Sequence, residues 1–539
     1  MKRVIILVLL VGIIAIPFIL RPSRTKPGRA DDVLVIITPH NEAIRHEFGI
    51  GFQKWYRERT GRSVFIDWRV IGGTSEIVRF LRSEYTTSFE VFWKRQLGRD
   101  WSTEALVGMF DERAKLDDTP ADDTVGEAAR RAFLASEVSC GIDIFYGGGS
   151  YDFEREARAG RLVDSGILQR KAEWFTDAII PQRFAGEPYW DPAGRWIGAV
   201  VSSYGILYNR ESLARLGVEP PVHWVDVTNP ALIGEVALAD PTKSSSIGKA
   251  FEMVIQQQIQ KRLATLADTV ADPMEREARA VREGWIEGLR IIQRAGANAR
   301  YFTDSSQKPP IDVSQGNAAL GMCIDFYGRF QEEAVTRRDG STRLKYVTPP
   351  GGSVYSVDPI ALLRGAPSRD VAVDFIEFVL SMEGQRLWNF KTGTPGGPEH
   401  FALRRLPVRK DYYTADVTPL RSDPEVFPFN EKDQLVYHPE WTSGLFREMS
   451  LVIRLMCMDS HIELREAWEA IRAAGSPPEA LAVLGDLSAV NYDVTRSRIK
   501  AVLDSRDKVE ELRLSNELAG VFRENYRKAA RIARDAGGK

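Results

Sequence analysis

The feature that most constrains the fold is a unit of strand, polar loop and helix that recurs along the chain. The apolar run VLVIITP (33–39) has the length of a buried strand, and apolar residues at helical spacing follow it over 40–61. The stretches 63–70 with 72–85, and 141–160, repeat this order. Such alternation predicts an α/β fold with largely parallel sheets, whose ligands bind beyond the carboxyl ends of the strands.

Polar loops follow these predicted strands and supply the first candidate ligand-binding residues. They contain His40 and Asn41, then Gly72, Gly73 and Thr74, then Gly148, Gly149 and Ser150. Glycines let a backbone approach a ligand closely, and both glycine-rich loops precede a predicted helix. Each loop also has a purely structural interpretation, as a tight strand-to-helix turn or, for His40, as an ordinary surface histidine.

A further loop, in LADPTKSSSIGKAFEMVI (238–255), places three serines at the start of a predicted helix. A nucleotide-binding P-loop is excluded, because that motif needs a glycine and a hydroxyl where this chain has Lys243 and Ala250. Free N–H groups and the helix dipole at such a start favour an anionic or strongly polar ligand. The candidate ligand-binding residues are Ser244, Ser245 and Ser246; the alternative is that one serine only caps the helix.

The overall composition excludes several classes of function. The chain has 539 residues, enough for roughly two to four domains, and a net charge of −2. Since no long basic block occurs, we expect no nucleic-acid partner. Cys140, Cys323 and Cys457 lie far apart without a C-x-x-C pair. A disulfide framework and a cysteine zinc site are therefore excluded, while one disulfide bond stays open.

The motifs of common hydrolases are missing from the sequence. It contains no G-x-S-x-G, no H-E-x-x-H and no S-x-x-K with its partner boxes, and its six histidines form no i, i+4 pair. Paired carboxylates such as Asp117-Asp118 and Asp122-Asp123 fall in a charged stretch that we expect to be solvated. We therefore expect a protein that is not an enzyme and that uses no cofactor.

The N-terminus has the pattern of an export signal. Lys2 and Arg3 precede seventeen apolar residues (4–20), and Arg21 follows them. Seventeen residues lie at the short end of what spans a bilayer. We expect residues 1–30 to be a signal peptide or, in the version we favour, a retained membrane anchor. The rest of the chain would then lie in the periplasm or on the outer face of the cytoplasmic membrane.

Four segments carry a resemblance to a known family. They are IDIFYGGGSYDF (142–153), SSYGILYNRESL (202–213), LADPTKSSSIGKAF (238–251) and a Gly/Pro-rich return with its strand and helix (348–388). In this order the chain resembles the extracellular solute-binding proteins of ABC importers, in the type II periplasmic-binding-protein fold. Ferric-iron, phosphonate, thiamine and polyamine binders are among the similar members. The resemblance covers about residues 33–411.

The resemblance implies a two-lobed α/β fold, each lobe having a mixed, mostly parallel sheet flanked by helices. Lobe 1 would comprise residues 31–202, with a helical insertion at about 85–138, and residues 354–439. Lobe 2 would comprise residues 203–353. Residues 440–539, rich in helical patterns, would form a helical C-terminal extension.

The resemblance also adds candidate residues to the cleft between the lobes: Ser203, Asp325, Tyr327, Tyr355 and Asp358. Ferric-ion binders of this family use an adjacent tyrosine pair as phenolate ligands, but the corresponding positions here are Phe326 and Tyr327. We therefore expect no metal site, with iron at Tyr327 as an open alternative. Asp358 has the equal alternative of an Asp-Pro turn.

The implied function is that of an exported substrate-binding protein. It would capture a small polar or anionic solute in the cleft and deliver it to an ABC-type permease in the membrane, which its N-terminal segment would contact. One alternative is a ligand-sensing or scaffold domain at the membrane. Another is an exported hydrolase, which would need a nucleophile–base pair that the sequence does not reveal.

Overall fold

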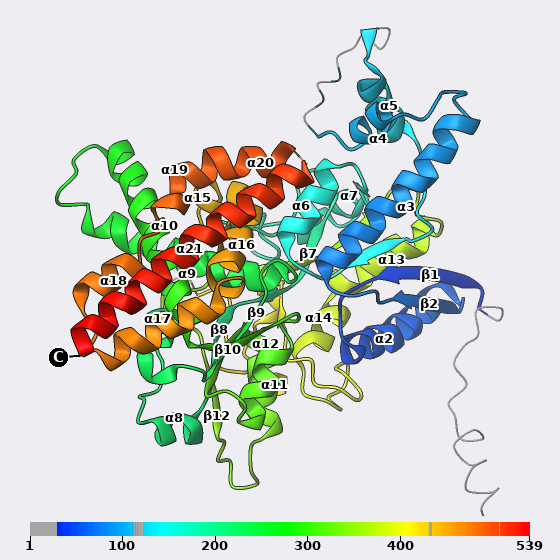
Figure 1. Ribbon diagram of the computed structural model, residues 1–539. Helices are drawn as coiled ribbons and strands as arrows, with labels where there is room; N and C mark the ends of the chain where they lie inside the picture. Colours follow the sequence, from blue (N-terminus) through cyan, green and yellow to red (C-terminus); the bar gives the residue numbers. More distant parts are fainter. Residues whose placement is uncertain are drawn as a thin grey trace, which may run out of the picture.

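The chain folds around two separate β-sheets, each flanked by helices (Figure 1). The structure is a computed structural model that describes residues 30–112, 114, 116, 122–430, 434–505 and 507–538. The first sheet organises one lobe and the second sheet the other. The predicted two-lobed α/β fold is thereby confirmed.

The sheet of the first lobe has the strand order β14-β7-β13-β3-β1-β2, with β4 beside β13. Its strands are β1 (Asp32–Ile37), β2 (Val64–Arg69), β3 (Ile144–Tyr146), β4 (Leu162–Val163), β7 (Ile197–Ser202), β13 (Ser356–Leu363) and β14 (Leu406–Pro407). A short hairpin of β5 (Arg183–Phe184) and β6 (Glu187–Pro188) lies outside this sheet. The inner strands β3 and β7 are buried along their whole length, as their continuous apolar runs require.

Helices of the first lobe begin where the sequence provides capping residues. Asn41 caps the first of them by accepting the N–H of Ile44 at 3.1 Å, and Gly61 ends it with φ 73°. The helices are α2 (Glu42–Thr60), α3 (Thr74–Arg95), α4 (Thr103–Gly108), α5 (Val125–Ala135), α6 (Ser150–Arg158), α7 (Ile167–Arg170), α13 (Arg369–Leu380) and α14 (Met382–Asn389).

The sheet of the second lobe has the order β10-β9-β11-β8-β12. Its strands are β8 (Tyr204–Asn209), β9 (Val236–Ala239), β10 (Ala299–Thr303), β11 (Leu320–Ile324) and β12 (Leu344–Val347). Its helices are α8 (Arg210–Leu216), α9 (Ser245–Thr265), α10 (Pro273–Asn298), α11 (Lys308–Gln315) and α12 (Asp325–Ala334).

Both sheets are mixed, as predicted, but parallel pairing does not predominate in either of them. In the first lobe β1 is parallel to β2 and β3, whereas β13 pairs antiparallel with β3, β4 and β7. In the second lobe β9 is parallel to β10 and β11, whereas β8 is antiparallel to β11 and β12. The antiparallel strands β7, β8 and β13 flank the two crossings between lobes, at Ser203 and at 348–355. The strands next to the crossings are thus the ones that pair antiparallel with their neighbours.

The C-terminal residues pack onto the second lobe as a helical layer, and Figure 1 shows α21 (Lys508–Gly537), in red, along α17. The shorter helices are α15 (Pro439–Thr442), α16 (Phe446–Ile453), α17 (His461–Ala473), α18 (Pro478–Leu484), α19 (Tyr492–Val494) and α20 (Lys500–Ser505). One continuous hydrophobic core joins this layer to α9 and α10. Trp285 of α10, for example, donates from Nε1 to the carbonyl of Val490 at 3.0 Å. The predicted helical C-terminal part is confirmed.

The stretch expected as a helical, solvated insertion (85–138) contains helices, and these pack against one another. In Figure 1, α4 and α5 lie beside the far end of α3, away from the rest of the first lobe. Phe89 and Trp93 of α3, Met109 and Phe133 are buried there and belong to the core of the first lobe. The described part of this stretch is therefore held by apolar contacts, and only its outer faces are solvated.

The predicted signal or anchor, residues 1–29, lies outside the described residues. Within the part of the chain that the structure describes, no helix combines the length and apolar character needed to cross a membrane.

Replacing Trp285 by alanine tests the shared core. This side chain is fully buried, so we expect Trp285→Ala to lower the free energy of unfolding by about 3–5 kcal/mol. The second lobe and the C-terminal helices should lose structure together in urea, as followed by tryptophan fluorescence and far-UV circular dichroism. Met274→Ala, at a side chain that is 81% exposed, is the matched control and should stay within about 0.5 kcal/mol. Separate transitions for the two parts would contradict a shared core.

Candidate functional site

A cavity of about 500 Å³ lies between the two lobes, at the carboxyl ends of strands from both sheets. The loops after β1, β2 and β3 line it from the first lobe, and those after β9, β10 and β11 line it from the second. This is the position at which open α/β sheets bind ligands. Its lining residues are Pro39, His40, Val70, Gly72, Gly73, Thr74, Glu76, Gly148, Lys243, Ser244, Ser246, Asp304, Ser305, Ser306, Gln307, Ile324, Phe326, Tyr327, Asp358 and Arg405.

Arg405 is the dominant charge of the cavity. Its side chain is 1% exposed, and its Nη2 donates to Asp358 Oδ2 at 2.5 Å and to Ser202 Oγ at 2.8 Å. The guanidinium carbon lies 4.4 Å from the ring centre of Phe326. Its Nε has no hydrogen-bond partner among the described residues. An arginine fixed in this way presents a preorganised positive charge in surroundings that exclude most water.

His40 is buried beside this arginine and is uncharged. Burial, reinforced by the positive charges of Arg405 and Arg45, holds the pKa of His40 well below its usual range. Its Nε2 lies 3.4 Å from Arg405 Nη1, so the neutral ring can accept a hydrogen bond from the guanidinium. Nδ1 has no partner within the described chain. The residue thus adds a neutral polar group, and no second positive charge, to the cavity.

Helix starts from both lobes reach the cavity. In the first lobe α3 begins after Gly73, and no side chain caps its first turn. In the second lobe Ser244 caps α9 by accepting the N–H of Ile247 at 3.4 Å, and Ser246 and Lys243 face the cavity beside it. Such helix starts, supplemented by an ammonium group and hydroxyls, favour a negatively charged guest.

Aromatic side chains at the start of α12 form another wall. The rings of Phe326 and Tyr327 lie 4.1 Å apart, and burial raises the pKa of the Tyr327 hydroxyl. A bound cation would meet the Arg405 guanidinium at this wall and a phenol that does not ionise readily. Over the described ranges, no group of three or more His, Cys, Asp or Glu residues is arranged to hold a metal ion.

The cavity brings together many of the residues singled out in the sequence. They are His40, Gly72, Gly73, Thr74, Gly148, Ser244, Ser246, Tyr327 and Asp358. Gly149, Ser150 and Ser245 instead line a smaller cavity of about 170 Å³. Contact of any of these residues with a ligand remains a prediction.

Four other predicted residues lie away from the main cavity. Asn41 caps α2. Ser203 is fully buried in the first crossing, and its carbonyl accepts the N–H of Asp325 at 2.9 Å. Asp325 is buried and pairs with Arg329 Nη2 at 2.6 Å. Tyr355 lines a neighbouring cavity together with Arg329. Asn41 and Asp325 are thus occupied by contacts within the protein, whereas the Ser203 Oγ has no hydrogen-bond partner among the described residues.

Several cavity residues were missed in the sequence. Arg405 belongs to the doublet in LRRLP, where nothing in the local pattern distinguishes a buried arginine from a solvated one. Ser305, Ser306 and Gln307 follow β10 and precede α11. Their segment, TDSSQKPP, repeats the order of strand end, hydroxyl cluster and helix seen at 244–246, and this repetition was a usable signal.

The lobes touch through glycines at the rim of the cavity. A Cβ added to Gly149 of the first lobe would lie 3.1 Å from Ser245 Oγ of the second. A Cβ added to Gly73 would lie 3.4 Å from the carbonyl oxygen of Lys243. Gly149 has φ −80° and Gly73 has φ −75°, angles open to any residue. The two lobes can therefore approach each other because these residues lack a side chain. A special backbone conformation is not needed.

The fold and the cavity define a two-lobed protein with a polar, partly cationic site at the junction of its lobes. Residues 141–407, about half of the chain, match the family model of bacterial extracellular solute-binding proteins. This part of the chain belongs to that family. The matched segment contains β3, both crossings, the whole sheet of the second lobe and Arg405.

Individual relatives are more distant. An uncharacterized protein of Haemophilus influenzae is 28% identical over 250 residues, 46% of this chain and 60% of that protein. The phosphoglycerate transport regulatory protein PgtC of Salmonella typhimurium is 23% identical over 191 residues, 35% of this chain and 40% of PgtC. The chain thus spans less than two thirds of the length of these relatives. The periplasmic binding protein P5PA superposes with a TM-score of 0.48 at 17% identity, over 78% of this chain and 95% of that chain.

The uncharged state of His40 predicts a pH dependence. The unfolded chain protonates this histidine near its usual pKa of 6.5, whereas the folded chain resists protonation, so stability is lost as the pH falls below that value. Relative to His40→Gln, the parent should lose up to about 1.4 kcal/mol of unfolding free energy per pH unit below pH 6.5. Urea unfolding between about pH 7.5 and 5.5 measures this difference. Burial also lowers the pKa of His461, but this residue is present in both proteins and its effect cancels in the comparison. Equal dependence of the unfolding free energy on pH in the two proteins would contradict a neutral His40.

The glycine contact predicts that bulk at residue 149 separates the lobes. In Gly149→Leu the new side chain would meet Ser245, and we expect the population with parted lobes to increase. Gly520→Leu is the matched control, because nothing lies within 4 Å of a Cβ at that exposed helical glycine.

Double electron–electron resonance (DEER) between spin labels on the two lobes measures the distance between the lobes. Exposed Glu58 of α2 and exposed Arg338 of the second lobe, each changed to cysteine, accept the labels. A Cys140→Ser background removes the half-buried native thiol, while the other cysteines are buried. We expect longer label distances in Gly149→Leu alone. Identical distance distributions in all three proteins would show that the glycine contact does not set lobe separation.

Proposed function

We propose that the chain is an exported substrate-binding protein, which captures a small anionic solute in the interlobe cavity and delivers it to an ABC-type permease in the membrane. The observation that carries the proposal is the buried Arg405, placed among helix starts contributed by both lobes. A solute that touches both lobes stabilises their closed arrangement, since a ligand shifts an equilibrium by its difference in affinity for the two states. Ligand-dependent closure is what a carrier needs for delivery.

The chemistry of the cavity favours a solute that combines an oxyanion with hydroxyl groups. Arg405, Lys243 and the start of α9 suit the oxyanion, while the Asp358 and Glu76 carboxylates at the same cavity can accept hydrogen bonds from hydroxyls. PgtC is named for phosphoglycerate transport. Phosphoglycerates, which carry a phosphate, a carboxylate and a hydroxyl, are therefore the first solutes to test.

A second candidate function is ligand sensing at the membrane. The similar protein PgtC is named as a transport regulatory protein, and the C-terminal helices of this chain share a core with the second lobe. Movement of that lobe would therefore carry the whole helical layer with it. In both functions we propose that residues 4–20 hold the protein at the outer face of the cytoplasmic membrane.

Solute binding by the parent and by Arg405→Gln tests the proposal. We expect an oxyanion at 100 times its dissociation constant to stabilise the parent by about 2.7 kcal/mol in thermal unfolding. Loss of the guanidinium leaves Asp358 unpaired and should weaken binding by about 2–5 kcal/mol in titration calorimetry.

The panel comprises inorganic phosphate, 2- and 3-phosphoglycerate, a phosphonate, a polyamine, a neutral sugar and ferric ion. Arg337→Gln is the control, since this arginine is 68% exposed on its side chain and lies outside the cavity. If no solute of the panel stabilised the parent, or if the polyamine or ferric ion did so in place of the anions, the proposal of an anion carrier would fail.

A further inference from the structure

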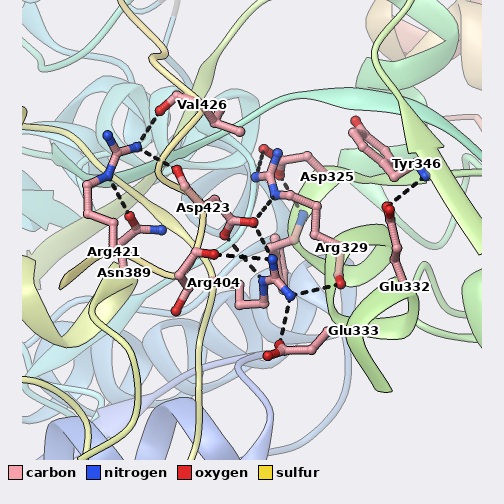
Figure 2. A network of polar contacts seen from close by, with 12 residues as sticks. Asp325, Arg329, Glu332, Glu333, Tyr346, Asn389, Arg404, Arg421, Asp423 and Val426 are labelled. Carbon is pink, nitrogen blue, oxygen red and sulfur yellow. Dashed lines mark hydrogen bonds and ion pairs between the residues drawn. The ribbon is translucent and has the colours of Figure 1, made fainter. Parts of the chain in front are cut away.

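Arg404 and Arg405 are neighbours whose side chains reach different parts of the protein. Arg405 lines the cavity, whereas Arg404 contributes to a separate polar network, drawn in Figure 2. Arg404 has φ 55°, in the left-handed region that residues other than glycine rarely adopt. Such a conformation persists when the contacts around a residue enforce it. The backbone at Arg404 thus directs two adjacent guanidinium groups to two sites.

The network around Arg404 centres on a fully buried carboxylate. Arg404 Nη2 donates to Asp423 Oδ1 at 2.5 Å, and Arg404 Nη1 donates to Glu333 Oε2 at 2.7 Å and to the carbonyl of Arg329 at 3.3 Å. Asp423 is 0% exposed, and its Oδ1 also lies 3.6 Å from Arg329 Nε. Arg421 donates to the backbone carbonyls of Asp423 and Val426 and so fixes this segment.

The network connects the two lobes. Arg404 and Asp423 flank β14 of the first lobe, while Arg329 and Glu333 belong to α12 of the second. The helix is tied to its own sheet, because Glu332 accepts the N–H of Tyr346 at 3.1 Å and the ammonium of Lys345 at 3.0 Å. Separation of the lobes would pull Arg329 and Glu333 away from Arg404 and Asp423.

The same helix forms part of the cavity wall one turn earlier. Phe326 and Tyr327 line the cavity, and the Arg405 guanidinium lies under the Phe326 ring. The doublet therefore holds α12 at two points: Arg405 at its first turn and Arg404 at Arg329 and Glu333. A displacement of the helix would disturb both contacts together.

We propose that Arg404 is a positioning residue, which ties the loop carrying Arg405 to α12 and so joins anion recognition to lobe closure. The inference rests on the proposed function for the identity of the solute. The contacts of Arg404 with α12, however, hold the lobes together even when no solute is bound. Lobe separation would break the Arg404 hydrogen bonds to Glu333 and to the Arg329 carbonyl. It would also remove Arg329 from the buried Asp423, so the ion cluster favours the closed arrangement. In the closed arrangement the Arg405 guanidinium is held in the position in which it would contact the solute.

The label pair at residues 58 and 338 tests the tie in the full chain, in detergent and without solute. We expect Arg404→Gln and Asp423→Asn to add a population at longer label distance. Arg404→Lys keeps the charge and should restore much of the short-distance population. Arg337→Gln should match the parent. With 3-phosphoglycerate as the probe, affinity in Arg404→Gln should fall about 10-fold, within the range of ordinary coupling energies.

Glu333→Gln gives a variant that preserves the buried part of the network, since this side chain is 59% exposed. It should add a long-distance population that the parent lacks, although a smaller one than in Arg404→Gln. This variant keeps the inference testable if Arg404→Gln or Asp423→Asn loses the native fold. Parent-like distances in Glu333→Gln and in every folded Arg404 or Asp423 variant would overturn the inference. Absence of 3-phosphoglycerate binding by the parent would count against the proposed solute alone, because the distances are measured without it.

Discussion

The structure depends most on the buried ion pair between Arg405 and Asp358, at the place where the two lobes meet. A guanidinium that is 1% exposed is costly to bury without compensating partners, and here Asp358 pairs with its charge while Phe326 supports it from α12. Asp358 lies on β13 of the first lobe and Phe326 on α12 of the second. The pair therefore defines both the electrostatics of the cavity and one contact across it.

The cavity around this pair is a consequence of strand direction. Parallel strands in each lobe end at the same edge, so their following loops converge although they lie far apart in sequence. Glycines at 73 and 149 then allow the two edges to approach without side chains between them. The uncapped start of α3 and the guanidinium of Arg405 complete surroundings in which an anion is favoured over a cation.

Much of this arrangement was predictable from local patterns, and the remainder depended on packing over long sequence distances. The starts of α3 and α9, and the hydroxyls and glycines before them, follow from strand–loop–helix order and capping rules. Asp325 was predicted in the cavity, yet its partner four residues later turns it into an ion pair. Arg405 was missed because its burial depends on Asp358, 47 positions away. Strand directions in the middle of each sheet likewise depend on which distant segments pair, and they have no local signal.

The central claim is that an anion occupies the interlobe cavity in contact with Arg405. A crystal structure of the protein co-crystallised with 3-phosphoglycerate tests this claim most directly. The account predicts phosphate or carboxylate oxygens within hydrogen-bond distance of Arg405 and of the serines at the start of α9. Density for the solute elsewhere on the protein, or a cation bound in this cavity, would contradict it.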